Sequence, residues 1–188
     1  MPDLDIPDGL FLPEAGSSNM TDPLMAQGDW FLTFSLESIF PLPAGWTTDE
    51  GEQGTDILFS ANGNLDEPSI VIRLRFSGYA GDDRTVEEVM VEYELSLNED
   101  PTASILKRAI VDPSKGYIFL TWITDSDRKE NVLVLFSEDV SGFFHRFVVR
   151  TGPEDWDDYY PIVRAIVDHW ADWEYRPLGI ALPDDLSE

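Results

Sequence analysis

Few residues of this sequence have the chemistry that hydrolysis requires. Its two histidines are His145 and His169, and it contains no cysteine. A serine hydrolase needs a histidine base held by a carboxylate, together with a serine on a sharp exposed turn. His145 lies between Phe143 and Phe147 at the spacing of a strand face, and the nucleophile motif Gly-x-Ser-x-Gly does not occur. We therefore predict no catalytic residue, and a hydrolase ranks third among the candidate functions.

The acidic clusters of the sequence do not have the spacing of a metal site. Residues 125–130 read Asp-Ser-Asp-Arg-Lys-Glu, which lacks the glycine at the sixth position of a calcium-binding loop and includes two cations. Residues 154–158 hold four acids, which favour a helix start because they complement its dipole. A glycine-rich phosphate loop is also missing from the sequence. The sequence therefore predicts no metal and no cofactor.

Negative charge dominates the composition. The sequence has 37 Asp and Glu against 12 Lys and Arg, which gives a formal net charge of −25. Residues 1–72 hold 13 of these acids and neither a lysine nor an arginine. Binding to nucleic acid or to anionic lipid depends on basic side chains, so we predict no direct binding to nucleic acid. The acidic residues form either a general solvating surface or a patch that binds a basic partner.

The sequence shows no membrane span and no signal peptide. No stretch approaches 18 uninterrupted apolar residues, and the first residues have neither a basic region nor an apolar run. The absence of cysteine excludes disulfides and a lipid-modified cysteine in the chain as given. We expect a cytoplasmic location for this chain, with an exported mature form as the alternative.

Hydrophobic patterns predict several strands around two helices. The predicted strands are residues 30–34, 56–60, 69–77, 103–111, 116–123, 131–137 and 142–150. Unbroken apolar runs at 117–122 and 132–136 indicate central strands that are covered on both faces. We predict one domain over residues 29–176, preceded by an acidic arm rich in Pro and Gly at 1–28. Residues 177–188 are predicted to be an acidic tail.

Two amphipathic helices are predicted to cover the sheet. Thr85 to Glu88 fit a capping box, so the first helix begins there and runs to about Leu97. Its apolar face comprises Val86, Val89, Met90, Tyr93 and Leu97. The apolar face of the last helix comprises Tyr159, Ile162, Val163, Ile166, Val167, Trp170 and Trp173. Pro161 is predicted to lie in the first turn of this helix, where its missing N–H is harmless.

This order of elements, with Leu42-Pro43-Ala44-Gly45-Trp46 after the first strand, resembles the PsbP/DcrB-like superfamily. The resemblance implies an α+β fold, an α/β/α sandwich whose mostly antiparallel sheet has about six to seven strands. One helix lies between strands and the other is C-terminal. The resemblance also implies a non-enzymatic binding protein, since the group includes photosystem accessory proteins, a Ran-binding nuclear protein, bacterial lipoproteins and adaptor chaperones for type VI secretion effectors.

The leading hypothesis is a non-catalytic protein-binding module, such as an adaptor, chaperone or accessory subunit. It would use one sheet edge or the groove beside the terminal helix. Trp156, Tyr160 and Tyr175 are the predicted partner-binding residues, because they lie at the ends or the edge of the last helix. The runner-up is an acidic inhibitor or nucleic-acid-mimicking decoy that binds a basic partner. A homodimer is compatible with either hypothesis.

Overall fold

The computed structural model describes residues 29–33, 38–42, 47–50, 56–60, 70–76, 83–124, 127–140, 142–172 and 178–186. The predicted arm at 1–28 and Tyr175 lie outside these residues. The elements in chain order are β1 (Asp29–Thr33), β2 (Ser38–Leu42), β3 (Thr47–Glu50), β4 (Asp56–Ser60), β5 (Ile70–Phe76), α1 (Val86–Asn98), β6 (Ala103–Asp112), β7 (Lys115–Ile123), β8 (Lys129–Glu138), β9 (Phe144–Thr151), a 3₁₀ turn (Pro153–Asp155), α2 (Trp156–Asp168) and β10 (Ala171–Asp172).

Within the described residues, seven strands form the main sheet in the order β3-β4-β5-β9-β8-β7-β6. Every neighbouring pair is antiparallel, and β6 to β9 form the predicted meander. The α+β class and a sheet of six to seven strands are therefore confirmed. A smaller sheet of β1, β2 and β10 was not predicted. Its strand β2 includes Pro41, which pairs with Trp30 of β1.

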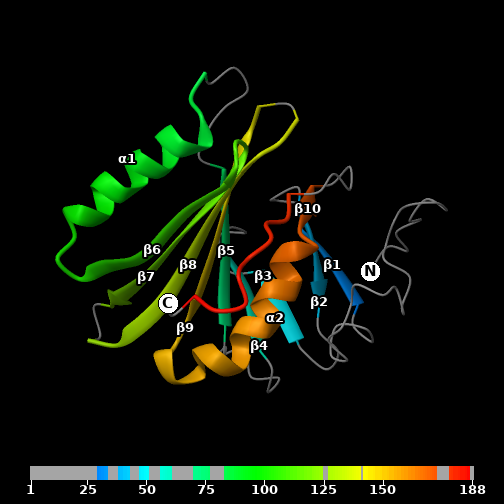
Figure 1. The fold of residues 1–188 in the computed structure, drawn as a ribbon. Helices are drawn as coiled ribbons and strands as arrows, with labels where there is room; N and C mark the ends of the chain where they lie inside the picture. The colour runs from blue at the N-terminus through cyan, green and yellow to red at the C-terminus, as the bar shows by residue number, and fades with distance from the viewer. Residues whose placement is uncertain are drawn as a thin grey trace.

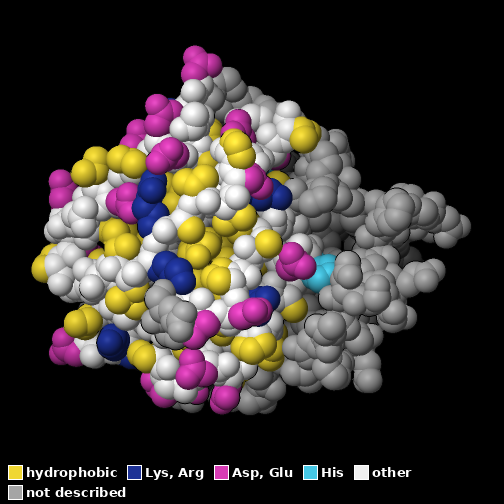
Figure 2. Space-filling view, in the orientation of Figure 1, with side chains coloured by type: hydrophobic (Ala, Val, Ile, Leu, Met, Phe, Trp, Pro, Cys, Tyr) yellow, Lys and Arg dark blue, Asp and Glu magenta, His cyan; other side chains and the backbone are white. Residues whose placement is uncertain are grey.

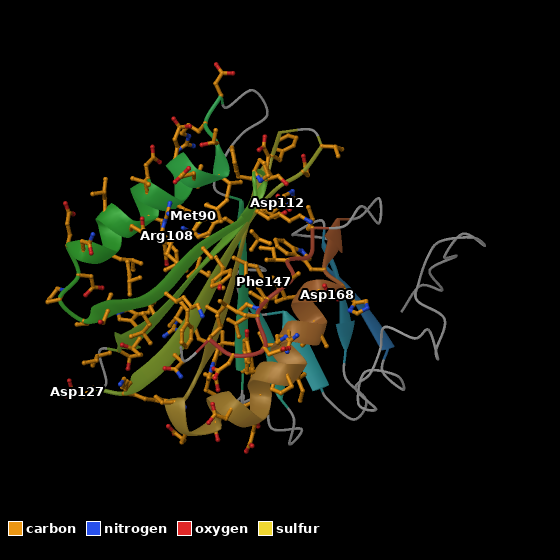
Figure 3. All side chains as sticks on the ribbon, viewed as in Figure 1. Met90, Arg108, Asp112, Asp127, Phe147 and Asp168 are labelled. Atoms are coloured by element: carbon orange, nitrogen blue, oxygen red, sulfur yellow. The ribbon has the colours of Figure 1, made fainter. Side chains whose placement is uncertain are left out.

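Helix α1 covers one face of the main sheet (Figure 1). The buried residues of this layer are Val86, Val89, Met90, Ile118, Leu120, Val132, Val134, Phe136 and Phe144, with Tyr93 and Leu97 partly buried. The predicted apolar face of the helix is thus confirmed. Arg108 of β6 forms an ion pair with Glu94 of α1 at 3.2 Å, and Figure 3 shows Met90 and Arg108 between the helix and the sheet.

Helix α2 covers the opposite face, which completes the predicted α/β/α sandwich. The core of this layer includes Phe119, Leu133, Leu135, Phe147 and Val149 from the sheet and Val163, Ile166 and Val167 from the helix. Central strands β7 and β8 are therefore buried on both faces, as their unbroken apolar runs predicted. In Figure 3, Phe147 lies on the side of the sheet that faces α2.

A capping box starts α1, as predicted. The Glu88 amide donates to the Thr85 hydroxyl at 3.2 Å, and the Thr85 amide donates to the Glu88 carboxylate at 2.7 Å. The helix has no basic residue in its last turn. Its start is therefore fixed by two reciprocal hydrogen bonds, and its end has no side-chain cation to complement the dipole.

The prediction for the ends of α2 was wrong. The helix begins at Trp156, so Pro161 lies inside it rather than in the first turn. Pro153, and not Pro161, stands at the beginning of the helical segment, because it starts the 3₁₀ turn that precedes α2. Because Pro161 has no N–H, the carbonyl of Asp157 lacks its usual partner four residues on. The helix ends at Asp168, so Trp170 contributes to the core from beyond the helix, and Trp173 lies outside the described residues.

The described C-terminal segment, residues 178–186, packs onto the α2 layer although the sequence suggested an acidic tail. Leu178, Ile180, Leu182 and Leu186 are all buried. The Lys115 ammonium donates to the Gly179 carbonyl at 2.7 Å. A Cβ atom at position 179 would clash with the carbonyl oxygen of Asp168, so this close approach requires glycine. Three of the buried residues, Leu178, Ile180 and Leu182, alternate with other residues in the sequence. This period-two spacing indicates burial, although the acidic residues of the segment suggested an exposed tail.

Candidate functional site

The sheet brings together a serine, an aspartate and a histidine near the β8–β9 hairpin. His145 Nε2 lies 3.0 Å from Asp139 Oδ2, and Asp139 Oδ1 accepts from the Phe143 amide at 3.1 Å. Ser137 lies directly opposite His145 across the two strands. The His145 ring also contacts Trp170 edge to face, with ring centres 6.1 Å apart. Asp139 was not predicted from the sequence, because its position depends on the hairpin.

Burial argues against hydrolysis at this cluster. The exposed fraction of Ser137 is 0%, and the side chains of Asp139 and His145 are 7% and 5% exposed. A substrate must approach the nucleophile within bonding distance, and these side chains are covered by protein atoms. In the described part of the chain the Ser137 hydroxyl has no hydrogen-bond partner. The arrangement supports a structural role, in which Asp139 organises the hairpin and orients His145.

His169 also has a local structural contact. Its Nδ1 lies 2.9 Å from the carbonyl oxygen of Ala165, one turn earlier in α2. A carbonyl oxygen only accepts, so Nδ1 carries the proton of this hydrogen bond. His169 therefore caps a carbonyl at the end of α2.

The structure buries two of the three predicted partner-binding residues. Trp156 stacks on Phe119 with ring centres 4.9 Å apart, and Tyr160 stacks on Trp156 at 5.4 Å. The Tyr160 hydroxyl donates to the Pro183 carbonyl at 2.7 Å. Burial raises the pKa of the Tyr160 hydroxyl above its ordinary value. Residues 178–186 therefore occupy this side of α2, the side where the sequence suggested a binding groove.

An open groove lies instead on the α1 face of the main sheet. Its cavity volume is about 200 Å³. We call it the α1 groove, and its lining residues are Tyr93, Leu97, Leu120, Trp122, Val132, Arg146, Val148 and Arg150. Helix α1 supplies the first two, and strands β7, β8 and β9 supply the others. The groove combines an apolar floor with two aromatic rings and two arginines.

Each arginine of the α1 groove lies over an aromatic ring. The guanidinium carbon of Arg146 lies 5.2 Å from the centre of the Tyr93 ring, and that of Arg150 lies 4.9 Å from the centre of the Trp122 ring. The Trp122 indole N–H donates to Thr102 at 2.8 Å, which fixes the orientation of its ring. Cation–π contacts of this kind hold the two guanidinium groups at the groove walls.

Strand pairing adds two arginine positions to this face. Arg75 of β5 pairs with Arg146 of β9, and Arg73 pairs with Val148. Directly paired residues of antiparallel strands share a face, so positions 73 and 75 belong to the face that carries Arg146 and Arg150. Arg75 and Arg146 are therefore directly paired across β5 and β9, whereas Arg73 pairs with Val148 and Arg150 pairs with Val71.

The two acidic clusters of the sequence lie near the start of β8 and at the start of α2. Of the cluster at 125–130, Asp127 and Arg128 lie between β7 and β8, and Lys129 and Glu130 belong to β8, where Lys129 pairs with Ile123. Asp157 and Asp158 lie in the first turn of α2, as predicted for acids that complement a helix dipole. Among the described residues, no group of three or more His, Asp or Glu side chains has the arrangement of a metal site. None of the described helices is both long enough and apolar enough to cross a membrane.

Comparison with known proteins identifies the fold class. No protein-family model matches the sequence, and no curated protein matches it significantly. PsbP (CyanoP) of Synechocystis sp. PCC 6803 is similar in structure, with 14% identity and a TM-score of 0.52 over 77% of this chain and 92% of that chain. The Ran-binding protein Mog1p of Saccharomyces cerevisiae has 12% identity and a TM-score of 0.51 over 78% of this chain and 95% of that chain.

A third similar structure is PA94 of Pseudomonas aeruginosa, described as a protein of unknown function and putative regulator. It has 12% identity and a TM-score of 0.49 over 73% of this chain and 91% of that chain. The chain therefore has the sandwich fold of the PsbP and Mog1p structures, and the resemblance inferred from the order of its elements is confirmed for the fold. At these identities the similarity defines the fold alone.

The α1 groove was not predicted from the sequence, because its lining residues come from four elements that are separate in the chain. Tyr93 and Leu97 were predicted to be core residues of the first helix, and the structure leaves them partly buried. Trp122, Arg146 and Arg150 carry no motif in the sequence. The one available signal was the alternation in β5, which places Arg73 and Arg75 on the face opposite Ile72 and Leu74.

Proposed function

We propose that this chain is a non-catalytic protein-binding module, an adaptor or accessory subunit that binds its partner in the α1 groove. The observation that carries the proposal is the groove itself, with Leu97, Leu120 and Val148 among the apolar residues beside two arginines that rest on aromatic rings. Tyrosine, tryptophan and arginine are the residues that most often dominate the binding energy of protein interfaces. An open apolar groove with these side chains in its walls supports partner binding better than catalysis.

The rest of the described chain supports the same function. The cluster of Ser137, Asp139 and His145 is buried, so it offers no accessible nucleophile. Mog1p, which has the same fold, is described as a Ran-binding protein. A fold alone does not define a function, but this example supports a binding role for a sandwich of this kind.

A matched pair of substitutions on α1 tests the proposal. Leu97 lines the groove, whereas Leu95, two residues away, points outward and is 61% exposed. The full chain, Leu97→Asp and Leu95→Asp are each used for quantitative affinity capture from the source organism, after circular dichroism has verified their folding. We expect Leu97→Asp to lose the partner and Leu95→Asp to retain it. Equal capture by all three proteins would contradict the proposal.

The acidic exterior supports a second candidate function, a decoy or inhibitor that binds a basic partner. Exposed acids include Glu87, Glu88 and Glu92 on α1, and Figure 2 shows acidic side chains spread over one face of the molecule. A complex held by these charges loses affinity steeply as salt increases, because salt screens exposed charges. Capture that persists at high salt favours the groove, and capture that disappears favours the decoy.

A homodimer would use a different surface. Strand β6 is an end strand of the main sheet, and its Leu106 side chain is 56% exposed. Exposed end strands can pair with a second copy, although the two irregularities in the β6 register oppose this pairing. Concentration-dependent dimers that dissociate with Leu106→Lys would support this arrangement.

A further inference from the structure

We infer that the α2 side of the sandwich is a second protein-binding surface, which binds an extended partner segment with the pattern apolar-Gly-apolar-x-apolar. In the structure, residues 178–186 of the chain itself occupy this surface, and we call them the C-terminal segment. The surface beneath them, which includes Lys115, Tyr160 and the Trp170 carbonyl, we call the α2 surface. A partner segment would replace the C-terminal segment there. This surface lies on the face opposite the α1 groove, so the inference goes beyond the proposed function.

The C-terminal segment is held in the manner of a bound peptide. It belongs to none of the described helices and strands, and Figure 1 shows it beside α2. The side chains at positions 178, 180 and 182 are buried, whereas Ala181 between the last two is exposed. Extended peptides typically bind in this way, with alternate side chains buried for specificity and main-chain hydrogen bonds for affinity.

Two side chains of the α2 surface recognise the main chain of the segment. The Lys115 ammonium donates to the Gly179 carbonyl, and the Tyr160 hydroxyl donates to the Pro183 carbonyl, each at 2.7 Å. Every peptide offers carbonyl oxygens along its main chain, whatever its side chains are. These two donors therefore suit a partner segment as well as the C-terminal segment.

A glycine requirement gives the α2 surface its selectivity. The amides of Leu178 and Gly179 both donate to the Trp170 carbonyl at 2.9 Å, which brings the segment close to the end of α2. A Cβ atom at position 179 would clash with the carbonyl oxygen of Asp168. This oxygen belongs to the backbone and cannot move aside as a flexible side chain does, so glycine is required. The surface therefore selects the pattern of residues 178–182, in which glycine lies between two buried apolar residues and a third follows.

The C-terminal segment opens more readily than a strand of the main sheet. It lies outside both sheets, and its ion pair between Arg164 and Asp184 contributes little because the aspartate is 95% exposed. Ordering nine residues costs conformational entropy of the same order as the gain from burying four apolar side chains. A segment with this balance opens locally while the rest of the fold stays intact. Local opening exposes the α2 surface to a partner.

A substitution of Gly179 in the full chain tests the inference. Gly179→Val places a side chain against the Asp168 carbonyl, so we expect it to displace the C-terminal segment. A fluorescent peptide with the sequence of residues 178–186 is titrated against the natural chain, Gly179→Val and the matched control Ala181→Val, which changes an exposed residue of the same segment. Gly179→Val should bind the peptide at least about tenfold more tightly than the other two proteins. In those proteins the attached segment competes at an effective concentration of about 1 mM.

Three further measurements define the specificity of the site. The same peptide with valine in place of its glycine should bind to none of the three proteins. Random nonapeptides displayed and selected on Gly179→Val should be enriched in the pattern apolar-Gly-apolar-x-apolar. Adding Lys115→Met or Tyr160→Phe to Gly179→Val removes one main-chain hydrogen bond and should weaken the peptide by about three- to tenfold.

Hydrogen exchange in α1 and in β7 to β9 verifies that Gly179→Val remains folded. If it does not, Leu182→Asp displaces the segment by placing a charge at a buried position, and the titration is repeated with that variant. If both variants are unfolded, the segment is an essential part of the core and no partner replaces it, which overturns the inference.

The remaining outcomes also decide the inference. A folded Gly179→Val that does not bind the glycine peptide, or that binds the glycine and valine peptides equally, would overturn it. Selected peptides that lack the glycine would do the same. Dimers of the natural chain that Gly179→Val abolishes would assign the α2 surface to a second copy and contradict the binding of a different partner. The capture experiment with Leu97→Asp tests the α1 groove separately, so the proposed function stands or falls independently of these results.

Discussion

The guanidinium of Arg150 lies 4.9 Å above the ring of Trp122 and donates through Nε to Glu130 at 2.7 Å. These residues come from β9, β7 and β8, which are neighbours in the main sheet. One wall of the α1 groove is therefore a cross-strand network in which a cation is held by a ring and a carboxylate. The Arg150 and Glu130 side chains are only 16% and 15% exposed, so solvent screens their interaction weakly.

The first prediction concerns this network. Arg150→Met removes the partner of the mostly buried Glu130 carboxylate, so we expect the free energy of unfolding to fall by about 1–3 kcal/mol. Combining it with Glu130→Met should recover most of the loss, because no unpaired charge then remains. Urea unfolding of the three proteins measures both effects. Exposed Arg128→Met is the control and should change stability by less than about 0.5 kcal/mol. A double variant less stable than Arg150→Met would contradict the account.

The second prediction concerns Tyr160 at neutral pH. Tyr160→Phe removes the hydrogen bond to the Pro183 carbonyl but keeps the ring stacked on Trp156. We expect a loss of about 0.5–1.5 kcal/mol in the free energy of unfolding at pH 7. Hydrogen exchange should increase in residues 178–186, which this bond helps to hold on α2. Unchanged exchange in that segment would show that the bond does not hold it.

Alkaline pH gives the third prediction, from the pKa of Tyr160. Burial raises this pKa, so the folded chain binds the phenolic proton more tightly than the unfolded chain does. The resulting stability is fully present below the ordinary pKa of 10.0 and is lost as the pH rises above it. The natural chain should therefore lose more stability than Tyr160→Phe between about pH 8 and 11. The pKa of Tyr117 is also raised, so the Tyr160→Phe variant should still lose some stability as the pH rises. If the free energy of unfolding fell equally with pH in the natural chain and in Tyr160→Phe, the raised pKa of Tyr160 would not contribute to stability.

The fourth prediction concerns the buried serine. Ser137→Ala removes a hydroxyl that has no partner among the described residues, so we expect unchanged or higher stability, by up to about 1 kcal/mol. Partner capture should also be unchanged, because Ser137 lies on the α2 face and not in the α1 groove. Thermal unfolding and quantitative capture test the two expectations. A loss of partner binding with Ser137→Ala would indicate a functional role for the cluster of Ser137, Asp139 and His145.

The sequence predicts most of the sandwich because its signals are local. Thr85 and Glu88 are three residues apart, and the runs that form β7 and β8 are continuous, so each element can be recognised without its neighbours. The predicted start of α2 was wrong because either Pro153 or Pro161 could stand at the beginning of a helix. The structure shows that Pro153 begins the 3₁₀ turn before α2 and that Pro161 lies inside α2.

The groove could not be predicted in the same way. Tyr93 and Arg146 are far apart in the sequence, and their contact depends on how α1 lies across the sheet. Trp156 and Tyr160 were predicted to bind a partner because Trp156 lies at one end of the last amphipathic pattern and Tyr160 lies at the edge of its apolar arc. Their burial depends on residues 178–186, and the local spacing from 178 to 182 indicates burial but not that this segment packs on α2.

The most direct test of the central claim is site-specific photocrosslinking in cells of the source organism. A benzophenone side chain at Leu97 lies in the α1 groove, while the same probe at Leu95 or Leu106 lies on exposed surfaces outside the residues that line it. We expect a crosslinked partner protein from position 97 and none from positions 95 and 106. Crosslinks from position 106 or 95 with none from position 97 would show that the partner binds elsewhere.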